Sequence, residues 1–265
     1  MFSPLQLAKK YIHYWLTASN GKGHGIHSPF VFDFVKHILN DTAKYHAYER
    51  VETLRSILLK DNTILEVEDM GAGSVVSKTK FRKVSGIARN AVKPKEFGQL
   101  LFRIVQFYKP ELIVELGTSL GLTTSYLALA NEKSRVISME GASSIADKAE
   151  THFKELGIKN IKLEKGNFDN TLPDVVKDLN KVDLGFIDGN HRREATLLYF
   201  KILSEKINTS SILIFDDIHW SEEMEDAWKI IKSHSSVTLS IDLFFIGLVF
   251  FRKEFKIKQH FTIRY

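Results

Sequence analysis

The expected fold rests on one stretch, Leu112-Ile113-Val114-Glu115-Leu116-Gly117-Thr118-Ser119-Leu120-Gly121-Leu122-Thr123-Thr124. A short apolar run ends in an acid, a Gly-x-x-x-Gly loop follows, and a helical pattern continues to residue 131. Such a run is typical of a buried parallel strand, and glycines at its carboxyl end let the backbone approach a ligand closely. Ligands bind at this edge of an open α/β sheet. The stretch therefore predicts a ligand-binding loop, and a purely structural strand–turn–helix unit with two glycines is the alternative.

The glycine spacing separates this loop from two common nucleotide-binding loops. Dinucleotide folds use Gly-x-Gly-x-x-Gly to hold a pyrophosphate on a helix N-terminus, and phosphate-binding loops end in Gly-Lys-Ser/Thr; neither pattern occurs here. A second glycine-rich segment, 69–74, also follows an apolar–acidic run. No acid lies about twenty residues after it, where a ribose ligand is expected. We expect this second segment to form a turn or a hairpin.

Composition places the chain among ordinary globular proteins. It has 265 residues, of which 44% are hydrophobic and 26% are charged. The longest apolar run, residues 243–251, is too short to span a membrane, and the N-terminus shows no signal-peptide pattern. The absence of cysteine excludes disulfides, thiolate metal sites and a cysteine nucleophile. We therefore expect a cytoplasmic protein with no membrane partner.

Residues 1–94 are expected to form a mainly helical N-terminal extension to a domain formed by residues 95–265. Helical patterns cover 4–18, 30–39 and 43–59. Residues 1–95 carry 15 Lys and Arg against 8 Asp and Glu, whereas the remainder carries 22 against 24. A basic extension favours an anionic partner such as nucleic acid, or it is simply a solvated surface. It could also serve as a lid, a substrate contact or the contact of a homodimer.

The loop between the first two predicted helices contains two histidines three residues apart, His24 and His27. This spacing is compatible with a metal site, but no cysteine or clear third ligand accompanies them. A loop that packs over the active site is one alternative. A loop with only a structural role is the other.

Strands and helices alternate regularly after a predicted helix at 95–108. The predicted strands are 111–116, 135–139, 160–164, 182–187 and 211–216, and the helices are 121–131, 143–156, 171–179, 191–206 and 221–233. Alternation of this kind predicts a parallel sheet built from βαβ units. Two closing strands, 236–241 and 244–252, predict an antiparallel hairpin at one edge. The expected fold is thus a doubly wound, mostly parallel α/β sheet of seven strands.

Acidic and polar residues follow the next two predicted strands. Glu140 ends the second strand, 23 residues after Gly117, where a carboxylate can accept hydrogen bonds from both ribose hydroxyls of a nucleoside. A helix cap is the alternative role for Glu140. At the end of the third strand, Asn167 and Phe168 offer an amide and a ring where an adenine could lie. These three residues are therefore candidates for binding a nucleoside cofactor.

Three carboxylates follow the fourth and fifth predicted strands, which end at Asp188 and at Asp216-Asp217. Neighbouring carboxylates repel each other, so a cluster of them favours protonation or a bound cation. A hard divalent ion bound through oxygen atoms is the simplest solution. In the alternative, Asp217 or Ser221 caps the last helix. We expect Asp188, Asp216 and Asp217 to hold magnesium or calcium.

The strand followed by acid-x-Gly-x-x-x-Gly resembles the class I S-adenosylmethionine-dependent methyltransferases. Together with Glu140, Phe186-Ile187-Asp188 and Asp216-Asp217, it is similar to the catechol and caffeoyl-CoA O-methyltransferase group over residues 95–252. The N-terminal segment with His-Gly-Ile-His-Ser-Pro-Phe looks like an extension of uncharacterised bacterial methyltransferases. The resemblance implies S-adenosylmethionine as cofactor. The implied loop contacts are Glu115, Gly117, Thr118, Ser119 and Gly121, with Asp188 as a further contact.

The resemblance also implies a magnesium site and a catalytic residue. The family's metal acids correspond to Asp188 and Asp216, but Asp217 stands where the family has an asparagine ligand. The family's catalytic lysine corresponds to His191. An imidazole can act as a general base near neutral pH. Asp188 and His191 are therefore the predicted catalytic residues.

The expected activity is the transfer of a methyl group from S-adenosylmethionine to an oxygen of a small acceptor. An RNA methyltransferase and a metal-independent methyltransferase for another acceptor are the nearest alternatives. A nicotinamide oxidoreductase is disfavoured by the glycine spacing. A cofactor-binding or nucleic-acid-binding module without catalytic activity is the remaining alternative.

Overall fold

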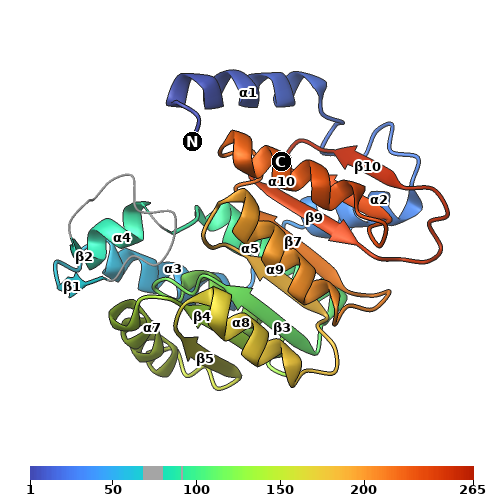
Figure 1. Cartoon of the computed structure of the whole chain (residues 1–265). Coiled ribbons are helices and arrows are strands. Elements are labelled where there is room, and N and C mark those ends of the chain that lie inside the picture. Colours follow the sequence, from blue (N-terminus) through green and yellow to red (C-terminus); the bar gives the residue numbers. More distant parts are fainter. Residues whose placement is uncertain (68–79, 91) are drawn as a thin grey trace. The chain divides into compact units, whose positions relative to one another are not determined.

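The computed structural model describes residues 1–67, 80–90 and 92–265. These residues form two compact units, one of residues 42–177 and one of residues 1–41 and 178–265 (Figure 1). The first 41 residues thus belong to the same unit as the C-terminal residues. The expected boundary between residues 94 and 95 stays a prediction.

The 42–177 unit contains three parallel strands in the order β3-β4-β5. Their bounds are Leu112–Leu116, Arg135–Glu140 and Ile161–Lys165. Val136 pairs with Ile113 on one side and with Ile161 on the other. The helices of this series are α5 (Lys95–Tyr108), α6 (Leu122–Ala130), α7 (Ser143–Glu155) and α8 (Phe168–Lys177). The predicted alternation of strands and helices is confirmed here, and α5 has the predicted bounds.

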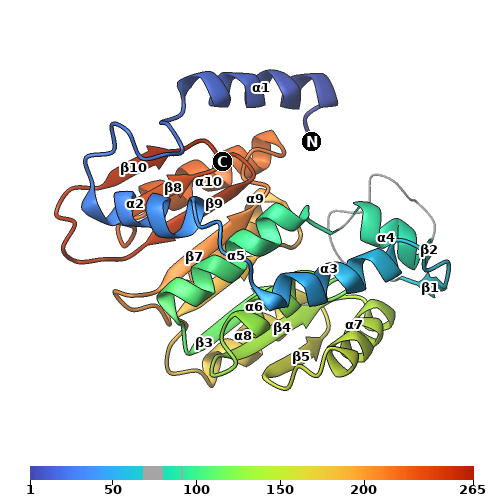
Figure 2. The same ribbon diagram turned by 180° about the vertical axis from the view of Figure 1, so that it is seen from behind.

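Four further elements precede α5 in this unit (Figure 2). They are helix α3 (His46–Leu58), strands β1 (Ile64–Glu66) and β2 (Phe81–Lys83), and helix α4 (Val84–Asn90). β1 and β2 pair antiparallel. The turn or hairpin predicted at 69–74 lies outside the described residues.

Tyr126 joins helices α3, α5 and α6 inside the 42–177 unit. Its hydroxyl donates a hydrogen bond to the Glu52 carboxylate at 2.8 Å. Its ring lies against Gly98, where an added Cβ would come within 2.5 Å of a ring carbon. The close helix contact therefore requires glycine at position 98.

The other unit contains five strands in the order β10-β8-β9-β7-β6. Their bounds are Gln259–Thr262, Leu239–Asp242, Ile246–Phe250, Ile212–Asp216 and Leu184–Ile187. β6 and β7 pair in parallel, whereas β9 pairs antiparallel with both β7 and β8. The helices are α1 (Pro4–Thr17), α2 (Pro29–Phe34) with a π-helical continuation (Val35–Leu39), α9 (Arg193–Ser204) and α10 (Glu222–Ser233). The predicted closing antiparallel hairpin is confirmed as β8 and β9.

The expectation of seven strands was wrong, because the described residues contribute eight strands to the main sheet. The additional strand, β10, pairs in parallel with β8. Its four residues alternate between half-buried and exposed, and three of them, Gln259, His260 and Thr262, are polar. So short an element gives little periodic signal, and its pairing with β8 provides the remaining stabilisation.

Among the described residues, no helix combines the length and the apolar character needed to cross a membrane.

Candidate active site

The glycine loop after β3 has a backbone that few other residues could adopt. Gly117, Ser119 and Gly121 have φ values of 104°, 49° and 84°. The N–H groups of Gly117 and Thr118 both donate to the Met139 carbonyl, at 2.9 and 3.1 Å. At Gly121, an added Cβ would lie 2.6 Å from the Phe153 ring. Conformation and packing thus both require glycine at position 121.

Glu115 of β3 forms hydrogen bonds to helix α6, which follows this loop, and to the neighbouring strand β4. Its carboxylate is fully buried and accepts hydrogen bonds from the hydroxyls of Thr124 and Ser138, each at 2.6 Å. Thr124 lies in the first turn of α6, and Ser138 lies in β4. The Thr118 hydroxyl is hydrogen-bonded to Ser138 as well. Glu115 therefore has a clear structural role, and a direct contact from it to a cofactor stays a prediction.

Glu140 lies at the carboxyl end of β4 and reaches across to the loop. One carboxylate oxygen accepts the Ser119 N–H at 2.8 Å, and the other accepts the Ala142 N–H at 3.0 Å. The side chain is half-buried, and a carboxylate offers about four acceptor positions. Both contacts hold the carboxylate beside the glycine loop. The structure thus gives Glu140 a loop-holding role that is compatible with the predicted ribose contact.

His152 of α7 is a loop-holding residue that the sequence analysis did not identify. Its buried Nδ1 lies 2.9 Å from the carbonyl oxygen of Leu120, inside the glycine loop. A carbonyl only accepts hydrogen bonds, so Nδ1 must carry the proton. Burial lowers the pKa of His152, and this favours the neutral imidazole. The partners lie 32 positions apart, so no local sequence signal predicts the contact.

Asn167 and Phe168 begin helix α8 after the end of β5. The Asn167 side-chain oxygen accepts the Asp169 N–H at 2.9 Å, which is the contact of a helix-capping asparagine. Both residues are half-buried. The preceding residue, Gly166, has a φ of 136°, a conformation that favours glycine. The predicted adenine contact of this pair stays a prediction.

In the other unit, Asp188, His191 and Asp216 come together. One potential ligand atom from each residue lies within 4.8 Å of the others. His191 Nε2 is 3.5 Å from an Asp188 carboxylate oxygen. Asp216 ends β7 and is buried, whereas Asp188 follows β6 and is half-buried like His191. The structure therefore brings together both predicted catalytic residues and two of the three predicted metal ligands.

Asp217 is not a member of this group. It has a left-handed backbone with a φ of 53°, and its N–H donates to the Phe245 carbonyl at 2.7 Å. The cap of α10 is Ser221, whose hydroxyl accepts the Met224 N–H at 3.2 Å. Of the two residues considered as caps, Ser221 therefore has that role. Asp217 as a third metal ligand stays a prediction.

The side chains of Asp188, His191 and Asp216 are of types that fit a divalent cation. Carboxylate oxygens are the ligands that magnesium and calcium prefer, whereas an imidazole nitrogen is a better ligand for transition metals. Asp188 and Asp216 therefore suit a hard cation, and His191 beside them is suited to accept a proton. Among the described residues, His24 and His27 belong to no group of potential metal ligands.

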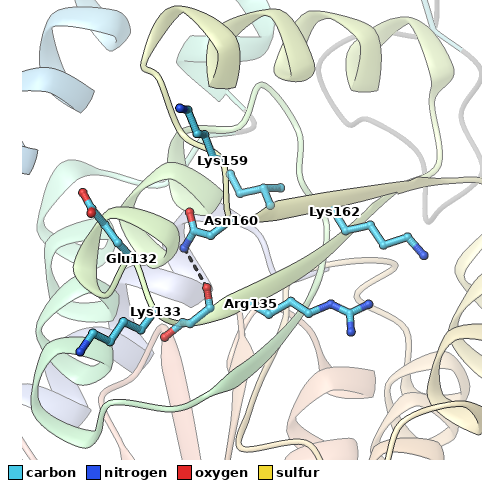
Figure 3. Close-up of a pocket in the computed structure, with 8 residues that line it drawn as sticks. Glu132, Lys133, Arg135, Lys159, Asn160 and Lys162 are labelled. Atoms are coloured by element: carbon cyan, nitrogen blue, oxygen red, sulfur yellow. Dashed lines mark hydrogen bonds between the residues drawn. The ribbon is translucent and has the colours of Figure 1, made fainter.

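A hollow of about 370 Å³ lies at the opposite, amino-terminal ends of β4 and β5 (Figure 3). Figure 3 shows Lys133 and Lys159 on one side and Arg135 and Lys162 on the other. Asn160 donates to the Ser134 carbonyl at 2.9 Å and fixes the chain there. Lys133 and Lys159 lie in the segments that follow α6 and α7, and Lys162 forms an ion pair with Glu164 at 2.7 Å. They are separate from the loop end of the strands.

Residues 114–218 match a family model described as a methyltransferase domain. No curated protein matches the chain.

Solved structures with the same fold include several methyltransferases. The SAH-bound methyltransferase PaMTH1 of Podospora anserina has a TM-score of 0.59 at 12% identity, with 96% of this chain and 98% of that chain covered. An O-methyltransferase from Bacillus cereus in complex with SAH has a TM-score of 0.55 at 18% identity, covering 83% and 97%. The SAM-bound O-methyltransferase TomG of Streptomyces achromogenes has a TM-score of 0.54 at 17% identity, covering 62% and 82%. The family match over residues 114–218 and the fold shared with these structures both support an S-adenosylmethionine-dependent methyltransferase.

Proposed function

We propose that this protein transfers the methyl group of S-adenosylmethionine to a hydroxyl oxygen of a small acceptor. The observation that carries the proposal is the Gly117–Gly121 loop, which Glu140 holds at the carboxyl end of β4. The loop offers its backbone to the methionine part of the donor. Glu140 accepts hydrogen bonds from the ribose hydroxyls of the donor, and Asn167 and Phe168 contact its adenine.

The acceptor is bound at the group formed by Asp188, His191 and Asp216. His191 takes the proton of the acceptor hydroxyl, since a neutral imidazole is a suitable base near neutral pH. Asp188 lies 3.5 Å from the His191 ring and stabilises the imidazolium that forms. Magnesium or calcium held by Asp188 and Asp216, with Asp217 as the proposed third ligand, would lower the pKa of the acceptor hydroxyl.

The transfer itself is a displacement at carbon, so the protein's main contribution is to align donor and acceptor. The loop and its supports, Glu115 and His152, hold the donor in a fixed position. O-methyltransferases among the solved structures with this fold support oxygen as the acceptor atom.

The experiment is a transfer assay with methyl-labelled S-adenosylmethionine. Catechols and other small vicinal diols are the first acceptors to test, because two oxygens can bind one metal ion. Label should appear in these compounds and depend on Asp216. If total RNA is labelled and no small hydroxyl compound is, the acceptor part of this proposal is wrong and an RNA methyltransferase replaces it.

A further inference from the structure

Helix α1 is fixed to its own unit by one face only. Its inner side chains, Leu7, Tyr11 and Tyr14, pack with Phe244 and Phe245. Lys10 forms an ion pair with Glu225 at 3.0 Å, and the Tyr14 hydroxyl donates to the carbonyl of Ile263. A capping box between Ser3 and Gln6 fixes the start of the helix. Because these contacts fix the rotation of α1 about its axis, its opposite face points away from the unit.

That opposite face is apolar and exposed. The exposed fractions of Leu5, Ile12, Trp15 and Leu16 are 68%, 59%, 46% and 72%. Three of these side chains, together with Tyr11, line a hollow of about 350 Å³. In both overall views α1 lies on the outside of its unit, beyond α10 and β10 (Figures 1 and 2). A contiguous exposed apolar surface of this kind marks an interaction site.

The part of the unit that carries α1 is strongly basic. Segments 1–41 and 252–265 are joined by a parallel bridge between Ser19 and Ile263. Together they contain nine Lys and Arg against three Asp and Glu, a net charge of +6, whereas the whole chain has +5. Helix α1 has no acidic residue. Six lysines of these segments form no ion pair within the described residues: Lys9, Lys22, Lys36, Lys253, Lys256 and Lys258.

We propose that the outer face of α1, defined by Leu5, Ile12, Trp15 and Leu16, binds reversibly to the surface of an anionic lipid bilayer. Amphipathic helices bind bilayers in this way, with Leu and Trp in the interface and cations near the lipid headgroups. The expectation of no membrane partner rested on the lack of a spanning segment, and a helix that lies on the surface needs none.

Charge and polarity distinguish a bilayer from the other partners that this face of α1 could bind. A second copy of the chain would bring the same basic segments close to those of the first, and like charges oppose such a contact. RNA matches the charge but gives no reason for four exposed apolar side chains. An anionic bilayer satisfies both properties, since its headgroups attract cations and its interior accepts apolar side chains.

The test uses the full chain with vesicles of phosphatidylglycerol and, separately, of phosphatidylcholine. Co-sedimentation is expected with the anionic vesicles only, and so is a blue shift of the tryptophan emission that is lost in the variant Trp15→Phe. The double variant Ile12→Ser/Leu16→Ser should weaken this binding by at least about tenfold. The matched control is Leu198→Ser/Ile230→Ser, which changes side chains that are 40% and 41% exposed on α9 and α10. The control should bind as the wild type does.

A second variant tests the charge. Lys253→Gln/Lys256→Gln should weaken binding at low salt and have less effect at high salt, because salt screens the attraction. The proposal is overturned if anionic vesicles are not bound, or if the α1 double variant binds as the wild type does. It is also overturned if ultracentrifugation of the protein alone shows a dimer that the α1 double variant dissociates. In that case a second copy covers the face.

Discussion

The Glu140 side chain joins the end of β4 to the glycine loop by accepting the Ser119 N–H at 2.8 Å. Ser119 has a left-handed backbone, and its N–H can point at Glu140 only because Gly117 and Gly121 let the chain turn on either side. The loop conformation and the position of the carboxylate therefore depend on each other. A substitution in the loop or at Glu140 should therefore affect the binding of the methyl donor.

Gly121→Ala should destabilise the protein and weaken donor binding. The new Cβ would meet the Phe153 ring at 2.6 Å on a backbone with a φ of 84°, so both strain and overpacking contribute. We expect a loss of about 1–3 kcal/mol in the free energy of unfolding. Urea unfolding measures it. The control is Gly86→Ala in α4, where an added Cβ has no atom within 4 Å. Equal stability of the Gly121 variant and the wild type would contradict the packing described here.

His152 should make stability depend on pH. Its pKa is lowered in the folded state, whereas in the unfolded chain it titrates near about 6.5. The stabilisation is therefore complete above that value and is lost as pH falls towards the folded-state pKa, at no more than about 1.4 kcal/mol per pH unit. Urea unfolding between about pH 5 and 7 measures the slope.

The variant His152→Gln provides the comparison, because glutamine can donate to the Leu120 carbonyl without titrating. The wild-type stability should fall more steeply with acid than that of the variant. Parallel pH profiles would show that His152 is not buried as a neutral group.

Removal of divalent cations should abolish methyl transfer and leave donor binding largely intact. Asp216→Asn should have the same effect, since it removes one carboxylate from the group with Asp188 and His191. His191→Gln should lower kcat by about 10²–10⁴-fold with little change in donor affinity. Labelled-methyl transfer with and without added magnesium or calcium measures all three effects. Full activity after exhaustive chelation would contradict the proposed metal site and leave His191 as the remaining candidate for the general base.

Local patterns in the sequence were sufficient to predict the strands and helices between residues 95 and 252, whereas β10 was not predicted. Helix α5 is a clear case, because its apolar residues repeat at helical spacing and Pro110 follows its end. Glycine spacing likewise indicated the loop after β3, and strand ends indicated Glu140 and the acids. These features all lie within a few residues of the signal that predicts them.

Contacts between distant residues could not be predicted in the same way. His152 contacts a carbonyl 32 residues away. His219 lies between Glu225 and Asp242, with 3.0 Å to each carboxylate, and only the pairing of β8 with β9 places Asp242 there. The bridge from Ser19 to Ile263 connects nearly opposite ends of the chain. Such contacts arise from tertiary packing, for which a single sequence carries no periodic signal.

The most direct test of the central claim is a calorimetric titration with S-adenosylhomocysteine and, separately, with NADH. The wild type should bind the adenosyl ligand, and NADH should bind more weakly or not at all. Glu140→Gln should weaken adenosyl binding by about 1–3 kcal/mol, because charged hydrogen bonds to the ribose are lost. Glu150→Gln, on the exposed side of α7, is the matched control and should have no effect. Equal affinity in the Glu140 variant, or tighter binding of NADH, would contradict the assignment of this loop as the donor site.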